Sequence, residues 1–135
     1  MKRIFVTILL TVVFAGCNTW ERNTFNTLSA SKAVIDTASQ DYTSRKIPQT
    51  HCANFIITDA RAAQTVAVNA MVVYEQLKAT KGDLTAQQAI VTADLVKLAP
   101  LAVQIQSLIA DPANTCNQAA DAAAIQRAKS QGVQQ

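Results

Sequence analysis

Three long runs of apolar residues at helical spacing, separated by only two short breaks, constrain the fold of this chain more than any other feature. The runs cover residues 21–42, 49–80 and 85–109, and a helix advancing about 100° per residue gathers their apolar side chains near one side. Pro48 marks the first break, because the residue before a proline disfavours helical geometry. Gly82 marks the second, and we expect it to be the left-handed residue that ends the helix. No strand-like alternation accompanies these runs, so the chain is predicted to be all-α.

The same spacing predicts the core. The apolar stripe of the first helix holds Phe25, Leu28, Ile35, Ala38 and Tyr42. That of the second holds Cys52, Phe55, Ala63, Val66, Ala70, Val73 and Leu77. That of the third holds Leu84, Val91, Leu95, Leu98, Ala102, Ile105 and Ile109. Pro100 is predicted to kink the third helix without dividing it. Short connections make neighbouring helices antiparallel, which predicts a small up-down-up three-helix bundle over residues 23–116. Residues 117–135 are expected to form either a short fourth helix or a flexible tail.

The first 16 residues differ in character from the rest. A basic start, Met1-Lys2-Arg3, precedes an uncharged apolar run from Ile4 to Phe14. A membrane-spanning helix needs about 20 apolar residues, so this shorter run is typical of a signal-peptide core. It ends in Phe14-Ala15-Gly16-Cys17, an apolar residue and two small residues before a cysteine.

This pattern resembles the lipobox of bacterial prolipoproteins, although Phe14 stands where the class usually has leucine. The resemblance implies that residues 1–16 are removed and that Cys17 is diacylated and then acylated on its new amine, with palmitate among the expected chains. Residues 17–22 would then form a short tether. Ordinary cleavage after Ala15, releasing a soluble periplasmic protein, is the alternative.

The residues after Cys17 bear on location. Asn18, rather than aspartate, follows the cysteine, and by resemblance to enterobacterial sorting this implies the outer membrane, facing the periplasm. Trp20 either rests its ring among lipid headgroups or packs against the first helix. Removal of the leader takes away Lys2 and Arg3 and leaves ten basic against nine acidic residues. A nearly neutral chain lacks the basic patch that phosphate backbones require, so nucleic acid is not an expected partner.

Three cysteines would leave one unpaired in an exported protein. Lipidation of Cys17 leaves Cys52 and Cys116, which an antiparallel bundle brings to the same end, so we predict a disulfide between them. Two competing hypotheses concern the chemistry of these residues. His51 beside Cys52 at a helix start could favour a reactive thiolate. His51, Cys52, Asp111 and Cys116 have the chemistry of zinc ligands but not the usual spacing. Neither pattern is specific, and we predict no catalytic residue, metal or cofactor.

Two further sets of residues are candidates for binding. Asp59 falls within the expected stripe of the second helix, where it would meet Lys32, as a polar ligand site or as a structural ion pair. A second group of apolar residues lies off the expected stripes and could form a face for a protein partner or for self-association. Its members are Ile57, Val68, Met71, Val72, Val96 and Val103. Scattered exposed apolar residues are the alternative interpretation.

These observations favour a non-enzymatic, membrane-tethered lipoprotein of the cell envelope that acts as an interaction or structural module. A periplasmic ligand-binding or sensor protein with a polar site near Asp59 is one alternative. A receptor-blocking lipoprotein of the phage type is another. No small-molecule substrate is evident from the residues.

Overall fold

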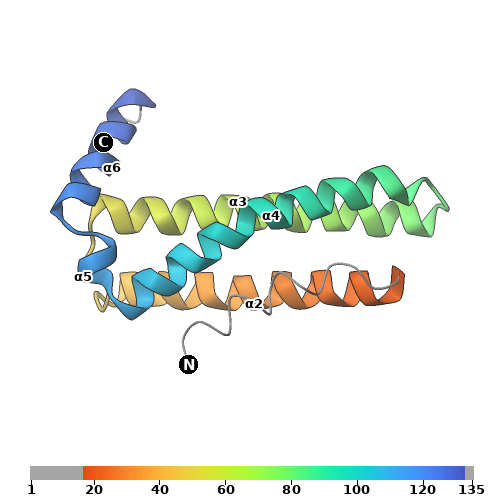
Figure 1. Cartoon of the computed structure of the whole chain (residues 1–135), viewed down its shortest axis with the longest axis horizontal. Coiled ribbons are helices and arrows are strands. Elements are labelled where there is room, and N and C mark those ends of the chain that lie inside the picture. The colour runs from red at the N-terminus through yellow and green to blue at the C-terminus, as the bar shows by residue number, and fades with distance from the viewer. Residues whose placement is uncertain (1–16, 133–135) are drawn as a thin grey trace.

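The computed structural model describes residues 17–132, which form five helices and no strand (Figure 1). The helices are α2 (Cys17–Thr43), α3 (His51–Ala79), α4 (Leu84–Ala110), α5 (Pro112–Thr115) and α6 (Gln118–Ser130). The all-α prediction is therefore confirmed. The predicted signal peptide, residues 1–16, lies outside the described residues.

The three long helices run alternately in opposite directions, and each packs against the other two. Figure 1 shows α4 lying along α3 over its first half and slanting across to α2 over its second half. Helix α4 continues through Pro100, as predicted, and this proline is exposed. Among the described helices, α4 alone has the length and mean hydropathy, 1.3, of a membrane-crossing helix, a property that the core helix of a soluble bundle also has.

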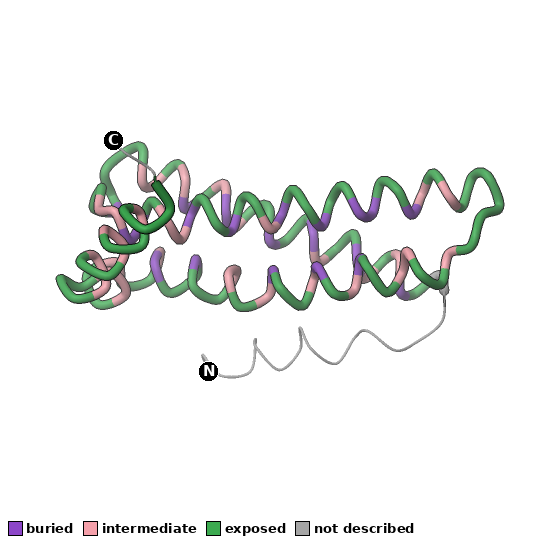
Figure 2. Tube along the Cα trace, turned by 90° about the horizontal axis from the view of Figure 1, so that it is seen from above, coloured by how far each residue is buried: buried purple, intermediate pink, exposed green. Residues whose placement is uncertain are grey.

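The core consists of residues on the inner sides of the long helices, as Figure 2 shows. On α2 the buried positions recur at intervals of three or four residues, which resembles the spacing of a coiled-coil seam. They are Trp20, Thr24, Leu28, Ser31, Ile35 and Ala38. The predicted stripe of α2 is correct for Leu28, Ile35 and Ala38, but Phe25 is half exposed.

The predicted stripe of α3 is wrong in its rotation about the helix. The buried residues are Cys52, Ala53, Ile57, Ala60, Gln64, Ala67, Ala70, Met71 and Tyr74. Val66 and Val73, which were expected in the core, are exposed. The physical reason is close approach, because the small Ala53, Ala60 and Ala67 on the inner face let α3 lie near its neighbours. Large apolar residues therefore lie on both sides of α3, with Ile57 and Met71 inside and Val66 and Val73 outside, so size alone does not mark the inner face.

Two of the long helices end in a Schellman motif. In α3, the N–H of Gly82 donates to the Leu77 carbonyl at 2.8 Å and that of Lys81 to the Lys78 carbonyl at 3.2 Å. The left-handed residue is Lys81, with φ 55°, so the expectation for Gly82 is wrong. Arg45 has the same role at the end of α2, with φ 62°.

The last two helices form a separate arm beside the start of α3 (Figure 1). The short fourth helix considered for the C-terminal segment is present as α6. None of its residues is buried, and it meets α3 through Asp121 at the Cys52 N–H and through Arg127 near Asp59.

Candidate functional site

The residue expected to carry the lipid, Cys17, is the first residue of α2. Residues 17–22, expected to be a tether, are helical and continue without interruption into the long helix. The prediction of a tether is therefore wrong, because Trp20 is part of the packed core and draws the first turns of the helix onto α3. A lipid on Cys17 would be joined directly to a helix of 27 residues.

A cluster of side chains fixes this end of α2 to the end of α3. Trp20 packs against Tyr74 with ring centroids 5.0 Å apart. The Tyr74 hydroxyl donates to Glu21 Oε1 at 2.9 Å, and Lys78 Nζ donates to Glu21 Oε2 at 2.6 Å. The Lys78 hydrogen bond lowers the pKa of Glu21, and the same bond raises the pKa of Lys78. Trp20 is 6% exposed, so it is packed inside the protein as one of the two hypotheses held, but against α3 and not against the first helix, of which it is itself a part.

A groove of about 580 Å³ runs between α2 and α3. Its floor includes the buried Leu28 and Met71, and the exposed Phe25, Val68 and Val72 stand along it. The remaining lining residues are Ser29, Lys32, Gln64, Glu75, Gln76 and Ala79. The surface of this groove is therefore mainly apolar.

The predicted apolar face is only partly present. Ile57 and Met71 are 5% and 2% exposed, so they belong to the core and the prediction is wrong for both. Ile57 and Met71 are buried because they lie on the side of α3 that faces the other helices, whereas Val66 and Val73 lie on the outer side. The other four members are exposed, with Val68 and Val72 on α3 and Val96 and Val103 on α4. The two α4 residues do not line the groove, so the four valines do not share one recess.

The predicted polar site at Asp59 and Lys32 is also wrong. The Asp59 side chain is 49% exposed and lies 3.9 Å from Arg127 of α6. Lys32, 65% exposed, instead pairs with Asp36 on its own helix. The cause is again the rotation of α3, which places Asp59 outside the interface with α2.

The polar contact between α2 and α3 joins Ser31 to Gln64, and the predicted stripe of the second helix did not include Gln64. Gln64, 8% exposed, accepts a hydrogen bond from the Ser31 hydroxyl at 2.9 Å and donates to the Leu28 carbonyl at 2.9 Å. Asp94 of α4 is also buried and pairs with Lys97 at 3.1 Å. One feature of the sequence could have identified Gln64 as buried, because it belongs to a set of α3 residues that repeat every three or four positions. The set is Ala53, Ile57, Ala60, Gln64, Ala67, Met71 and Tyr74.

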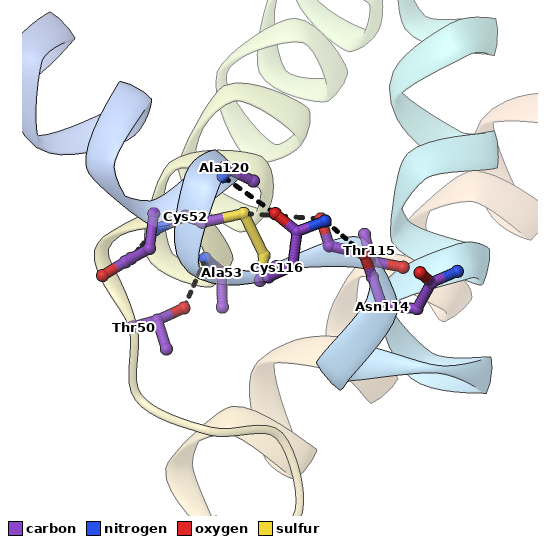
Figure 3. Close-up of a disulfide and its surroundings, with 9 residues drawn as sticks. Thr50, Cys52, Ala53, Asn114, Thr115, Cys116 and Ala120 are labelled. Atoms are coloured by element: carbon purple, nitrogen blue, oxygen red, sulfur yellow. Dashed lines mark hydrogen bonds between the residues drawn. A yellow bond between two sulfur atoms is a disulfide. The ribbon is translucent and has the colours of Figure 1, made fainter.

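The opposite end of the bundle carries the predicted disulfide. Cys52 and Cys116 are bonded, with their Cα atoms 5.6 Å apart (Figure 3). Thr50 Oγ1 caps α3 by accepting the Ala53 N–H at 3.1 Å, and Asp121 of α6 accepts the Cys52 N–H at 2.8 Å. An acidic group at a helix start is stabilised by the helix dipole. Because the disulfide occupies the Cys52 sulfur, this residue has no free thiol for the nucleophile considered above.

Comparison with known proteins identifies the leader. Residues 1–18 match the prokaryotic membrane lipoprotein lipid attachment site. The N-terminus is a lipobox-type lipoprotein signal. The cysteine within the matched residues is Cys17. No curated protein and no solved structure shows a significant match to the chain.

Proposed function

We propose that this chain is a non-enzymatic lipoprotein of the bacterial envelope, held at the periplasmic face of the outer membrane by lipid on Cys17. The observation that carries the proposal is the lipobox directly before a packed helix. Multiple acyl chains anchor a protein stably, whereas a single chain does so only marginally. With no tether after Cys17, the helical domain stays beside the membrane surface.

The arrangement of the long helices supports a rigid module of the up-down-up type. The Trp20–Tyr74 and Glu21–Lys78 contacts tie the lipid-bearing end of α2 to the end of α3. The turn between α3 and α4 lies at this same end. The disulfide and α6 lie at the other end, about 40 Å away for a helix of 27 residues rising about 1.5 Å each. This far end, and the exposed valines of α4, would be presented to a partner.

Lipidation is tested by mass spectrometry of the N-terminal peptide of the protein expressed with its own leader, with Cys17→Ser as the matched control. We expect the wild-type peptide to begin at Cys17 and to carry acyl chains, and the control to carry none. A wild-type peptide beginning at Gly16 without lipid would establish the soluble periplasmic alternative instead.

Location is tested by separating inner and outer membranes on a density gradient. We expect the wild-type protein in the outer-membrane fraction and Asn18→Asp in the inner-membrane fraction, since Asn18 is the basis of the sorting prediction. Equal distributions for both proteins would refute this part of the proposal.

The interaction role is tested with a photoreactive residue placed at Val96 or Val103 in intact cells, and at the exposed Gln104 of α4 as the control. We expect one discrete protein adduct from the valine positions and none from Gln104. The same adducts from all three positions would indicate random encounter and would count against an apolar partner face on α4.

A further inference from the structure

The groove between α2 and α3 reaches the end of the molecule where the lipid is attached. The Trp20–Tyr74 ring contact and the Glu21–Lys78 ion pair set the register of the two antiparallel helices. In this register Ala79, which lines one end of the groove, is level with the first turn of α2. Cys17 is the first residue of that turn. The α3 side of the groove therefore reaches the level of Cys17, whereas its α2 side starts at Phe25, about two helical turns further along.

The dimensions of the groove fit a long acyl chain. Along α3 it extends from Ala79 to Gln64, a distance of about 22 Å at about 1.5 Å per residue. An extended sixteen-carbon chain with C–C bonds of about 1.5 Å spans about 20 Å. The groove volume of about 580 Å³ lies within the range of roughly 300–1,000 Å³ that small-molecule sites occupy.

The chemistry of the lining also fits an alkyl chain. Phe25, Val68 and Val72 expose apolar surface along it, above Leu28 and Met71. At the far end, Gln64 is hydrogen-bonded to Ser31 and to the Leu28 carbonyl, and Lys32 pairs with Asp36. Gln64 and Lys32 therefore already have polar partners within the protein, and an alkyl chain beside them would not take these partners away. Glu75 and Gln76 lie toward the Ala79 end, where the polar linkage of the lipid would sit.

We propose that one acyl chain of the lipid on Cys17 lies in this groove instead of in the bilayer. The inference rests on the proposed lipidation of Cys17 and adds a destination for one of its chains. Two chains suffice for stable anchoring, so a triacylated cysteine has one chain that can leave the bilayer. That chain covers the exposed side chains of the groove and clamps the start of α2 against α3.

The test uses the full lipidated protein in isolated membranes. Cells are fed a fatty acid of palmitate length bearing a photoreactive diazirine near its methyl end, membranes are irradiated, and adducts are located by mass spectrometry. We expect intramolecular adducts between the Cys17 lipid and the far half of the groove, near Val68 and Gln64. The variant Val72→Lys places a charge in the groove, which disfavours an alkyl chain, and should reduce these adducts by at least about tenfold.

The matched control is Val66→Lys, an exposed valine on α3 itself that does not line the groove, which should change the adduct yield less than about twofold. Val68→Lys is a second groove variant, for use if Val72→Lys does not fold as judged by circular dichroism. Labelled Cys17 with adducts only to phospholipid refutes the groove proposal and leaves lipidation intact. Adducts joining two copies of the chain refute it in favour of dimerisation. Absence of label on Cys17 refutes both the lipidation and the inference that depends on it.

Discussion

The disulfide between Cys52 and Cys116 offers the most quantitative prediction about this fold. The perturbation is the double variant Cys52→Ala/Cys116→Ala, which removes the bond without leaving a free thiol at either position. The two cysteines are 64 residues apart in the sequence. In the chain-entropy treatment, opening a loop of about this length lowers the free energy of unfolding by about 4 kcal/mol.

Other contacts of the α6 arm compensate little for this loss. The arm has no buried residue, and the pair between Arg127 and Asp59 is largely exposed, so it contributes little. The hydrogen bond from the Cys52 N–H to Asp121 can still form in the variant, but without the disulfide nothing covalent holds α6 beside α3. For a mature chain of this size, about 4 kcal/mol corresponds to a fall in Tm of roughly 15–20 °C.

The assay is thermal unfolding followed by far-ultraviolet circular dichroism in detergent, with hydrogen exchange of the α6 amides measured in parallel. Wild-type protein under reducing conditions is the control, because it keeps both sulfur atoms and loses only the bond. We expect both samples to unfold at a similarly lowered temperature, with faster exchange over Gln118–Ser130 than in α3. A fall in Tm below about 4 °C would refute the loop-entropy reasoning, since it corresponds to about 1 kcal/mol.

Three further predictions concern the helix end, the buried amide and the ion pair. Lys81→Gly should raise the free energy of unfolding by about 0.5–1 kcal/mol in urea titrations, because Lys81 is left-handed, whereas Lys81→Ala should not raise it. Gln64→Ala should lower the free energy of unfolding by about 2 kcal/mol, because the hydrogen bond to the Leu28 carbonyl and buried volume are lost. Its control, Gln76→Ala at an exposed position, should change the free energy of unfolding by less than about 0.5 kcal/mol. The pKa of Glu21 is lowered by Lys78, so wild-type protein should exceed Glu21→Gln in stability above pH 4.5. That advantage should be lost as pH falls through the lowered pKa, and a pH-independent difference in Tm would contradict this assignment.

Part of the candidate site could be predicted from neighbouring residues alone. The lipobox is a short linear pattern, and the pairing of Cys52 with Cys116 followed from the order and lengths of the helices. The register that brings Ala79 level with the start of α2 could not be predicted in this way. It depends on Trp20 meeting Tyr74 and on Glu21 meeting Lys78, contacts between residues more than 50 positions apart in the sequence.

The sequence by itself determined the helical class, the breaks between the long helices, the lipid attachment signal and the disulfide. Each of these depends on local propensity, on a linear motif or on chain connectivity. Only the tertiary structure decided which face of α3 is inside, and with it the burial of Ile57 and Met71 and the exposure of Asp59. The reason is that several faces of an alanine-rich helix have similar hydrophobicity. Close approach to neighbouring helices, rather than the size of apolar side chains, then selects the inner face.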